Sequence, residues 1–204
     1  MTSLAVSRRR ANGWAGGLLR ACEFVAYPAL AGAAFCVLCL GVVTWLPALA
    51  ALAESLRRWR SDGDAACFTG VFAAFPRMWR ALWRHALVST VVYLVLALNA
   101  VFLAGQGSIG AVALLGAQVG IGVALVPYHL ALAAVAATDH NAGPAGWRRA
   151  ALLLAFGRPS RGLGLLAVAV LAPVVTVFIP LGPLLLGSSL PVLYALALTK
   201  GARS

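Results

Sequence analysis

Residues 86–138 read ALVSTVVYLVLALNAVFLAGQGSIGAVALLGAQVGIGVALVPYHLALAAVAAT, and this stretch decides the fold. Its 53 residues include no Asp, Glu, Lys or Arg. A helix needs about 20 apolar residues to cross a bilayer, so the stretch is long enough for two crossings. The uncharged Gly105-Gln106-Gly107-Ser108 turn divides it into two expected helices, 85–104 and 109–138. We therefore predict a membrane hairpin here.

Two further stretches have the same character. Residues 24–53 and 162–199 are also uncharged, and all 16 Lys and Arg residues lie outside the three stretches. Lys and Arg collect on the cytoplasmic side of a membrane, so both ends of each stretch are expected there. The sequence thus predicts an all-α, polytopic transmembrane helical bundle. It would have five to six membrane helices in three hairpins, amphipathic cytoplasmic helices, and both termini in the cytoplasm.

The 204 residues are expected to form a single membrane domain. We divide it into a basic cytoplasmic tail at 1–23, hairpin 1 at 24–60, an amphipathic cytoplasmic segment at 61–85, hairpin 2 at 86–138, a cytoplasmic loop and helix at 139–161, and hairpin 3 at 162–199. The element at 47–59 is short, because thirteen helical residues rise only about 20 Å. It either crosses with snorkelling arginines or forms a half-membrane element covered by its neighbours. Pro76 is expected to break or kink the amphipathic segment.

Composition supports the same class of protein. The chain is 62% hydrophobic and 10% charged, with a mean hydropathy of +0.93, whereas a soluble domain is about a quarter charged. A net charge of +11 would indicate nucleic acid in a soluble protein. The arginines here cluster at the ends of apolar stretches, so we predict anionic headgroups as the partner and no nucleic acid. The Arg, Ala and Leu bias indicates a bacterial inner-membrane protein.

Aromatic and basic residues alternate within 68–84, before the long uncharged stretch. Helical spacing of this kind suits a helix in the headgroup plane; the alternative is a cap packed on the bundle. We predict a lipid- or partner-docking surface formed by Arg77, Trp79, Arg80, Trp83 and Arg84.

Polar side chains inside the uncharged stretches are the other candidates for function. Asn99, Gln118 and His129 are candidate residues of a solute path, Asn99 and Gln118 by hydrogen bonding to sugar hydroxyls. For Asn99 and Gln118 the alternative, which we favour, is hydrogen bonding between helices. For His129 we also consider a proton relay, which is disfavoured because no Asp or Glu lies in the uncharged stretches. Gly116 and Gly120 form a GxxxG pattern, which indicates close packing inside the bundle or between copies.

No enzyme pattern is found in the sequence. It has no HExxH, GxSxG or Walker A motif, and its five acidic residues lie at the ends of spans or in the segments between them. Asp139 and His140 are adjacent in a Gly-Pro loop, which we interpret as a loop rather than an acid–base pair. Cys36 and Cys39 form a CxxC inside an apolar helix, and we interpret them as small apolar residues rather than a redox or metal site. We predict no catalytic residue, cofactor or metal.

Three pieces of the chain carry a resemblance. Thr44–Leu52 reads TWLPALAAL, residues 57–60 read RRWR before an acidic glycine turn, and Phe68–Arg80 forms the aromatic and basic segment. In these pieces the chain resembles the YesL-like family of bacterial membrane proteins, although Leu46 stands where that family has glycine. The resemblance implies an accessory or scaffold role beside sugar-transporter membrane subunits, with no catalytic residues. The polar residues support the alternative, a small-solute transporter.

Overall fold

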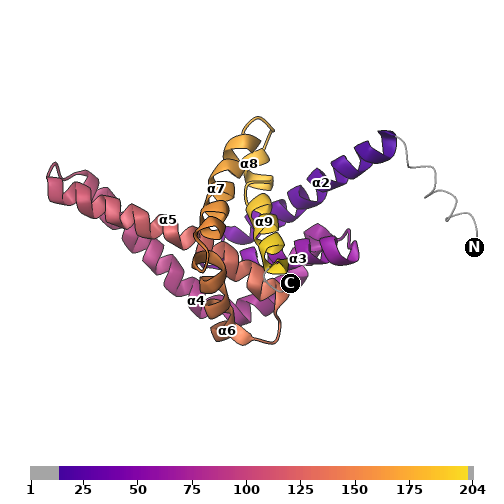
Figure 1. The fold of residues 1–204 in the computed structure, drawn as a ribbon, viewed down its shortest axis with the longest axis horizontal. Coiled ribbons are helices and arrows are strands. Elements are labelled where there is room, and N and C mark those ends of the chain that lie inside the picture. The colour runs from indigo at the N-terminus through magenta and orange to yellow at the C-terminus, as the bar shows by residue number, and fades with distance from the viewer. Residues whose placement is uncertain (1–13, 202–204) are drawn as a thin grey trace, which may run out of the picture.

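The structure is a computed structural model, and it describes residues 14–201. These residues form helices and no strand. In chain order the elements are α2 (Trp14–Cys39), the 3-10 helix η1 (Val42–Thr44), α3 (Trp45–Asp62), α4 (Cys67–Ala104), α5 (Ile109–Thr138), α6 (Gly143–Phe156), α7 (Pro159–Thr176), α8 (Gly182–Leu185) and α9 (Ser189–Lys200) (Figure 1). The predicted all-α class is confirmed.

Five helical segments of the described chain are long and apolar enough to cross a membrane. They are Gly16–Cys39, Cys67–Ala104, Ile109–Thr138, Pro159–Thr176 and Gly182–Thr199, the last of which combines α8 and α9. This agrees with the expected five to six membrane helices, and the fold is that of a multi-pass membrane protein. The exception among the expected elements is α3, which carries Glu54 and the arginines of its C-terminal half.

Helix α3 lies at the centre of the molecule. Its residues from Leu46 to Leu56 are all buried, and α2, α4, α5 and α9 pack around it. Phe24 and Tyr27 of α2 lie against Trp59, with ring centroids 5.3 and 5.8 Å apart, so α3 runs antiparallel to α2. Helix α3 is thus covered by its neighbours, and its 18 residues exceed the thirteen expected at 47–59.

Helix α4 departs from the prediction. The amphipathic segment 61–85 and the span after it were expected as separate elements, but residues 67–104 form one helix that continues through Pro76. Proline removes one backbone hydrogen bond, yet the buried face continues across it. Val71, Ala74, Met78 and Leu82 are all buried at helical spacing, and this packing on both sides of Pro76 keeps the helix continuous.

The two ends of the chain also differ from the expected boundaries. Helix α2 begins at Trp14, so residues 14–23 are helical and not part of a tail; Arg8, Arg9 and Arg10 lie outside the described residues. Near the other end, the second half of the expected hairpin 162–199 is divided into α8 and α9. Leu181 has a left-handed backbone, with φ of 60°, and Pro183 follows it, so the chain turns before α8 and again before α9.

The distal parts of α4 and α5 project from the core as an arm (Figure 1). In α5 only Ala111 and residues 127–137 are buried, and in α4 burial ends at Ser89. Beyond these points the arm exposes large apolar side chains, among them Val95, Leu98, Val101, Phe102, Val112, Leu114 and Val119. Exposed apolar patches of this extent mark a surface that lipid or protein covers.

Candidate functional site

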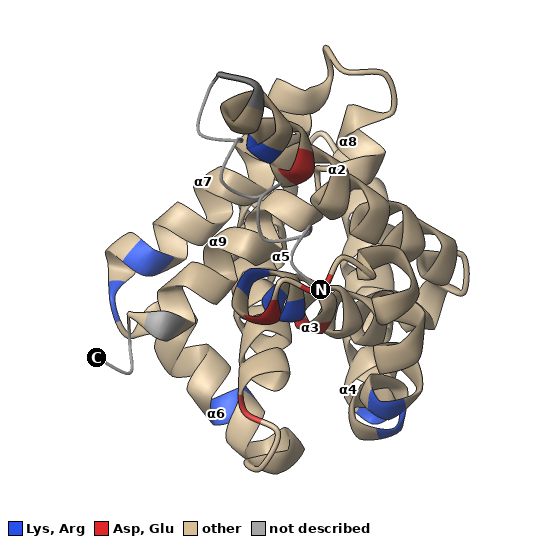
Figure 2. Ribbon diagram, turned by 90° about the vertical axis from the view of Figure 1, so that its right-hand side faces the viewer, with Lys and Arg blue, Asp and Glu red and all other residues tan. Residues whose placement is uncertain are grey.

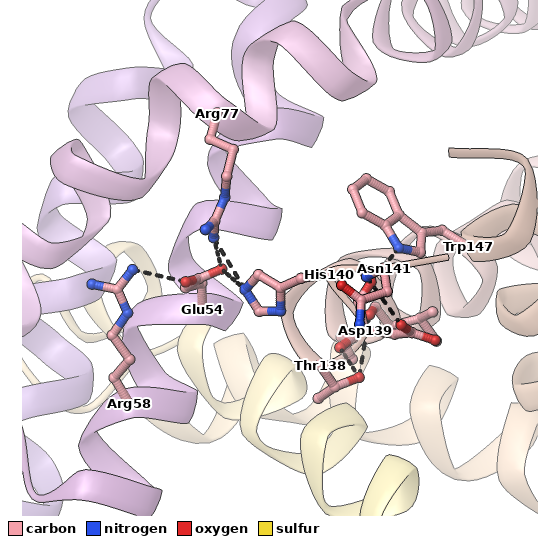
Figure 3. Close-up of polar contacts among 10 residues, drawn as sticks. Glu54, Arg58, Arg77, Thr138, Asp139, His140, Asn141 and Trp147 are labelled. Atoms are coloured by element: carbon pink, nitrogen blue, oxygen red, sulfur yellow. Dashed lines mark hydrogen bonds and ion pairs between the residues drawn. The ribbon is translucent and has the colours of Figure 1, made fainter. Parts of the chain in front are cut away.

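A buried carboxylate, Glu54 of α3, forms the polar centre of the core (Figure 3). Its Oε1 accepts a hydrogen bond from Arg58 Nη2 at 2.8 Å, one helical turn along α3. Its Oε2 is bound by Arg77 of α4 and lies 3.2 Å from His140 Nε2. The ion pairs found among residues 14–201 all involve Glu54.

The arrangement keeps Glu54 ionised. Burial raises the pKa of this carboxyl, but the hydrogen bonds donated by Arg58 and Arg77 outweigh burial and hold its pKa below the ordinary range. A buried charge is tolerated when it is paired and hydrogen-bonded. Glu54 therefore ties α3 to α4 and to the loop after α5.

Hydrogen bonds within the loop after α5 hold His140 close to Glu54. The Trp147 indole N–H donates to the Asp139 carbonyl, and the Asn141 N–H donates to Asp139 Oδ1 at 3.3 Å. Asp139 therefore orders the loop, while its neighbour His140 contacts Glu54 and lies 3.3 Å from Arg77.

Sequence reasoning did not identify Glu54 as a site residue. The four-residue spacing of Glu54 and Arg58 along one helix was the signal that could have found part of the network. The other partners, Arg77 and His140, come from distant segments, so their contact with Glu54 depends on the fold.

The five residues predicted to form a docking surface have different environments. Arg77 is bound to Glu54, and Trp79 stacks on Phe75 with ring centroids 6.0 Å apart and is half-buried. Arg80, Trp83 and Arg84 are exposed, and Arg84 Cζ lies 5.3 Å from the Trp83 ring centroid. The structure thus places one predicted residue in the core network and keeps the others at the surface.

Five aromatic residues on the first half of α4 follow one helical face, and we call them the aromatic stripe. They are Phe68, Phe72, Phe75, Trp79 and Trp83. Each is half-buried or exposed, whereas the residue just before each of them in the chain (Cys67, Val71, Ala74, Met78 or Leu82) is buried against the core. The helical spacing of most of these residues was visible in the sequence, and the structure shows that one side of the stripe remains open.

A cleft of about 580 Å³ lies where α4 meets α6. Arg80, Trp83, Arg84 and His85 of α4 line it together with Arg148 of α6. His85 and Arg148 were not predicted as site residues. The Trp147-Arg148-Arg149 piece looked amphipathic, but only the fold brings Arg148 opposite α4.

His129 belongs to a buried polar cluster. Its Nε2 lies 3.0 Å from Ser89 Oγ and its Nδ1 lies 3.4 Å from the Tyr93 hydroxyl. Beside it, the Tyr128 hydroxyl lies 3.2 Å from His85 Nε2. All these contacts join α4 to α5.

Asn99 and Gln118 lie in the projecting arm, away from this cluster. Asn99 is exposed, and the Gln118 Oε1 atom is buried with no hydrogen-bond partner in the described part of the chain. A separate cavity of about 210 Å³ is lined by His129, Tyr93 and Trp45, with neither Asn99 nor Gln118 in its wall. The structure therefore does not bring the three candidate solute-path residues together.

The CxxC pair lies on α2 where this helix meets α8. The Cys36 thiol donates to the Leu184 carbonyl at 3.1 Å, and both cysteines are free. Gly32, one turn earlier, packs directly on the Leu185 carbonyl oxygen, and a Cβ atom at this position would lie only 1.8 Å from that oxygen. Small residues here permit close contact between α2 and α8.

Comparison with known proteins finds a match to part of this core. The family model described as "Protein of unknown function, DUF624" matches residues 26–101. The match includes most of α2, all of α3 and most of α4, and so contains Glu54 and the aromatic stripe; it also contains the pieces that carry the YesL-like resemblance. No curated protein and no solved structure matches the chain significantly.

Proposed function

We propose that the protein is a non-catalytic accessory or scaffold protein of a sugar-uptake system in the bacterial inner membrane. The aromatic stripe of α4 would be its docking surface for a membrane subunit of the transporter. The link to carbohydrate uptake rests on the resemblance to the YesL-like family. The choice of docking surface rests on the exposure of the stripe.

The observation that carries the proposal is the open side of the aromatic stripe. Phe68 and Trp83 are 40% and 43% exposed, although their immediate neighbours Cys67 and Leu82 are buried in the core. Trp, Tyr, Phe and Arg are enriched at the centres of protein interfaces, and Arg80 beside the stripe is exposed. A partner helix with apolar and acidic side chains would fit this surface.

Orientation follows from the same residues. The basic residues of α4 and α6 lie at one end of the molecule (Figure 2), and under the positive-inside rule this end faces the cytoplasm. The proposal therefore places the stripe and both termini on the cytoplasmic side, where soluble and membrane subunits of a transporter meet.

Co-purification in mild detergent tests the docking. The unmodified protein is expected to carry membrane subunits of a sugar transporter, and a Phe68→Ala/Trp79→Ala variant is expected to lose them. Phe156→Ala is the matched control, because Phe156 is an exposed aromatic residue of α6 outside the stripe. Recovery of the unmodified protein without any transporter subunit would contradict the proposal.

A second candidate function, small-solute transport, has one observation in its favour. The cavity of about 210 Å³ beside His129 also contains Ser188, whose hydroxyl is buried without a partner in residues 14–201. Polar groups in an aromatic-lined cavity suit a small hydroxylated ligand. Sugar flux into liposomes containing only this protein, lost on Ser188→Val and retained on Asn99→Leu, would support transport. Absence of flux from the unmodified protein would exclude it.

A further inference from the structure

We propose that the cleft between α4 and α6 binds the phosphate headgroup of an anionic phospholipid. The inference does not depend on partner docking, because Trp83 is the one stripe residue among those that line the cleft. It assigns a ligand to Arg148, a residue outside the surface predicted from the sequence.

The charge of the cleft selects an anion. Arg80 and Arg84 are one helical turn apart on α4, and Arg148 faces them from α6. The wall of the cleft contains no carboxylate, and the ion pairs found in residues 14–201 leave these three arginines without an acidic partner. Guanidinium groups bind phosphate through two parallel hydrogen bonds, so three of them around one space favour a phosphate group.

The position of the cleft, beside the start of the uncharged part of α4, favours a lipid over a soluble phosphate as the ligand. Arg84 is the last charged residue before the uncharged stretch that begins at Ala86, and the exposed Val88, within that stretch, also lines the cleft. Trp83, at its edge, is of the type enriched at membrane–water interfaces. A ligand seated here has its charged part among the arginines and its apolar part beside Val88, which matches a phospholipid. Basic pockets between membrane helices bind anionic headgroups in this way.

The cleft is also large enough for a headgroup, and a polar part of its wall is held in place. Its volume of about 580 Å³ is within the range of small-molecule sites. His85 lines the cleft and its ring contacts the Tyr128 hydroxyl of α5, so this part of the wall is held by a contact between two helices. A lipid bound here would contact α4 and α6 together and would stabilise the folded protein.

The test is binding of short-chain phosphatidylglycerol to the delipidated, detergent-solubilised full chain, with short-chain phosphatidylcholine as the neutral comparison. Native mass spectrometry and the thermal midpoint would report binding. We expect Arg148→Gln to weaken phosphatidylglycerol binding at least tenfold, and Arg80→Gln/Arg84→Gln/Arg148→Gln to abolish it. Arg149→Gln is the matched control, since Arg149 is the exposed neighbour of Arg148 but does not line the cleft; we expect it to change affinity less than twofold.

Several outcomes would overturn the inference. Equal affinity for the two lipids would show that the charge is not recognised, and equal loss on Arg149→Gln would show a diffuse basic surface. If millimolar inorganic phosphate or glycerol phosphate displaces the lipid and raises the thermal midpoint equally, the ligand is a soluble phosphate. The single Arg148→Gln variant keeps the test valid if the triple variant fails to fold, because Arg148 is exposed and its loss leaves the core intact.

Discussion

Helix α3 and the arm formed by distal α4 and α5 have opposite relations to their surroundings. Helix α3 carries charged residues from Glu54 to Asp62, yet its first half is fully buried. The arm carries no charged residue, yet most of its large apolar side chains are exposed. In water this arrangement would be unfavourable, because about 25 cal/mol is lost for each Å² of apolar surface left exposed.

The comparison shows which surroundings suit each region, lipid for the arm and the protein interior for α3. Lipid satisfies the apolar surface of the arm, whose backbone hydrogen bonds are already made within its two helices. The buried charge of α3 is satisfied inside the protein, where Arg58, Arg77 and His140 surround Glu54. Polar groups in this protein are therefore buried where they find polar partners. Apolar residues need not be buried where lipid surrounds them.

The largest effect is expected from a charge placed in the arm. Val95 is exposed and lies at the middle of the uncharged part of α4, residues 86–104, so Val95→Arg should reduce membrane insertion by about 3 kcal/mol, the cost of arginine at a helix centre. A glycosylation-based insertion assay on α4 measures this directly. Val95→Leu is the control and should insert as the unmodified helix does; unchanged insertion of the arginine variant would mean that water or protein, not lipid, covers the arm.

A smaller effect is expected from removing the buried charge of α3. Glu54→Gln leaves Arg58 and Arg77 without their carboxylate, and the loss of charged hydrogen bonds should destabilise the fold by about 2 kcal/mol. Both arginines are partly exposed, so water compensates for part of the loss. Unfolding in mixed SDS micelles measures the change, and Glu23→Gln, at an exposed position of α2, should leave the unfolding midpoint unaltered. A neutral Glu54→Gln would show that the network does not hold α3 in place.

The lowered pKa of Glu54 also predicts that the stability of the protein depends on pH. Because the pKa of Glu54 is lower in the folded protein than in the unfolded chain, its contribution to stability is complete above the unfolded pKa of about 4.3. It is lost as the pH falls through the lower, folded pKa. The unfolding midpoint of the unmodified protein should therefore decline below about pH 4, and more steeply than that of Glu54→Gln, which retains the other acidic residues. Parallel curves for the two proteins would remove Glu54 as the cause.

The sequence predicted the helices more accurately than the places where one helix ends and the next begins. The uncharged stretches and the glycine turn at 105–108 placed α5 at 109–138, as observed, because apolar length and turn chemistry are local properties. Pro76 was expected to break or kink this segment, but α4 is unbroken there, and the contacts on both sides of the proline come from packing against other helices, above all α3. Local sequence does not contain that information.

The candidate sites show the same difference between local features, which the sequence reveals, and contacts between distant segments, which it does not. The arginines and aromatics of α4 were visible at helical spacing, and the polar residues in the spans were visible as exceptions to an apolar pattern. The binding of Arg77 to Glu54, the contact of His140 with both, and the position of Arg148 opposite Arg84 all join segments that are distant in the sequence. Composition and spacing identify such residues but not their partners.

The smallest effect is expected in the arm itself and concerns its amide side chains. Gln118→Leu removes a carbonyl oxygen that is buried without a partner in residues 14–201, so it should stabilise the protein by up to about 1 kcal/mol in the same SDS titration. Asn99→Leu, at an exposed position, should change stability by less than about 0.5 kcal/mol. If Gln118→Leu instead destabilises the protein, the amide has a partner outside the monomer. The open space around the neighbouring Gly116 and Gly120 would then be where a second copy packs, and this part of the arm would be an oligomer contact and not a lipid-facing surface.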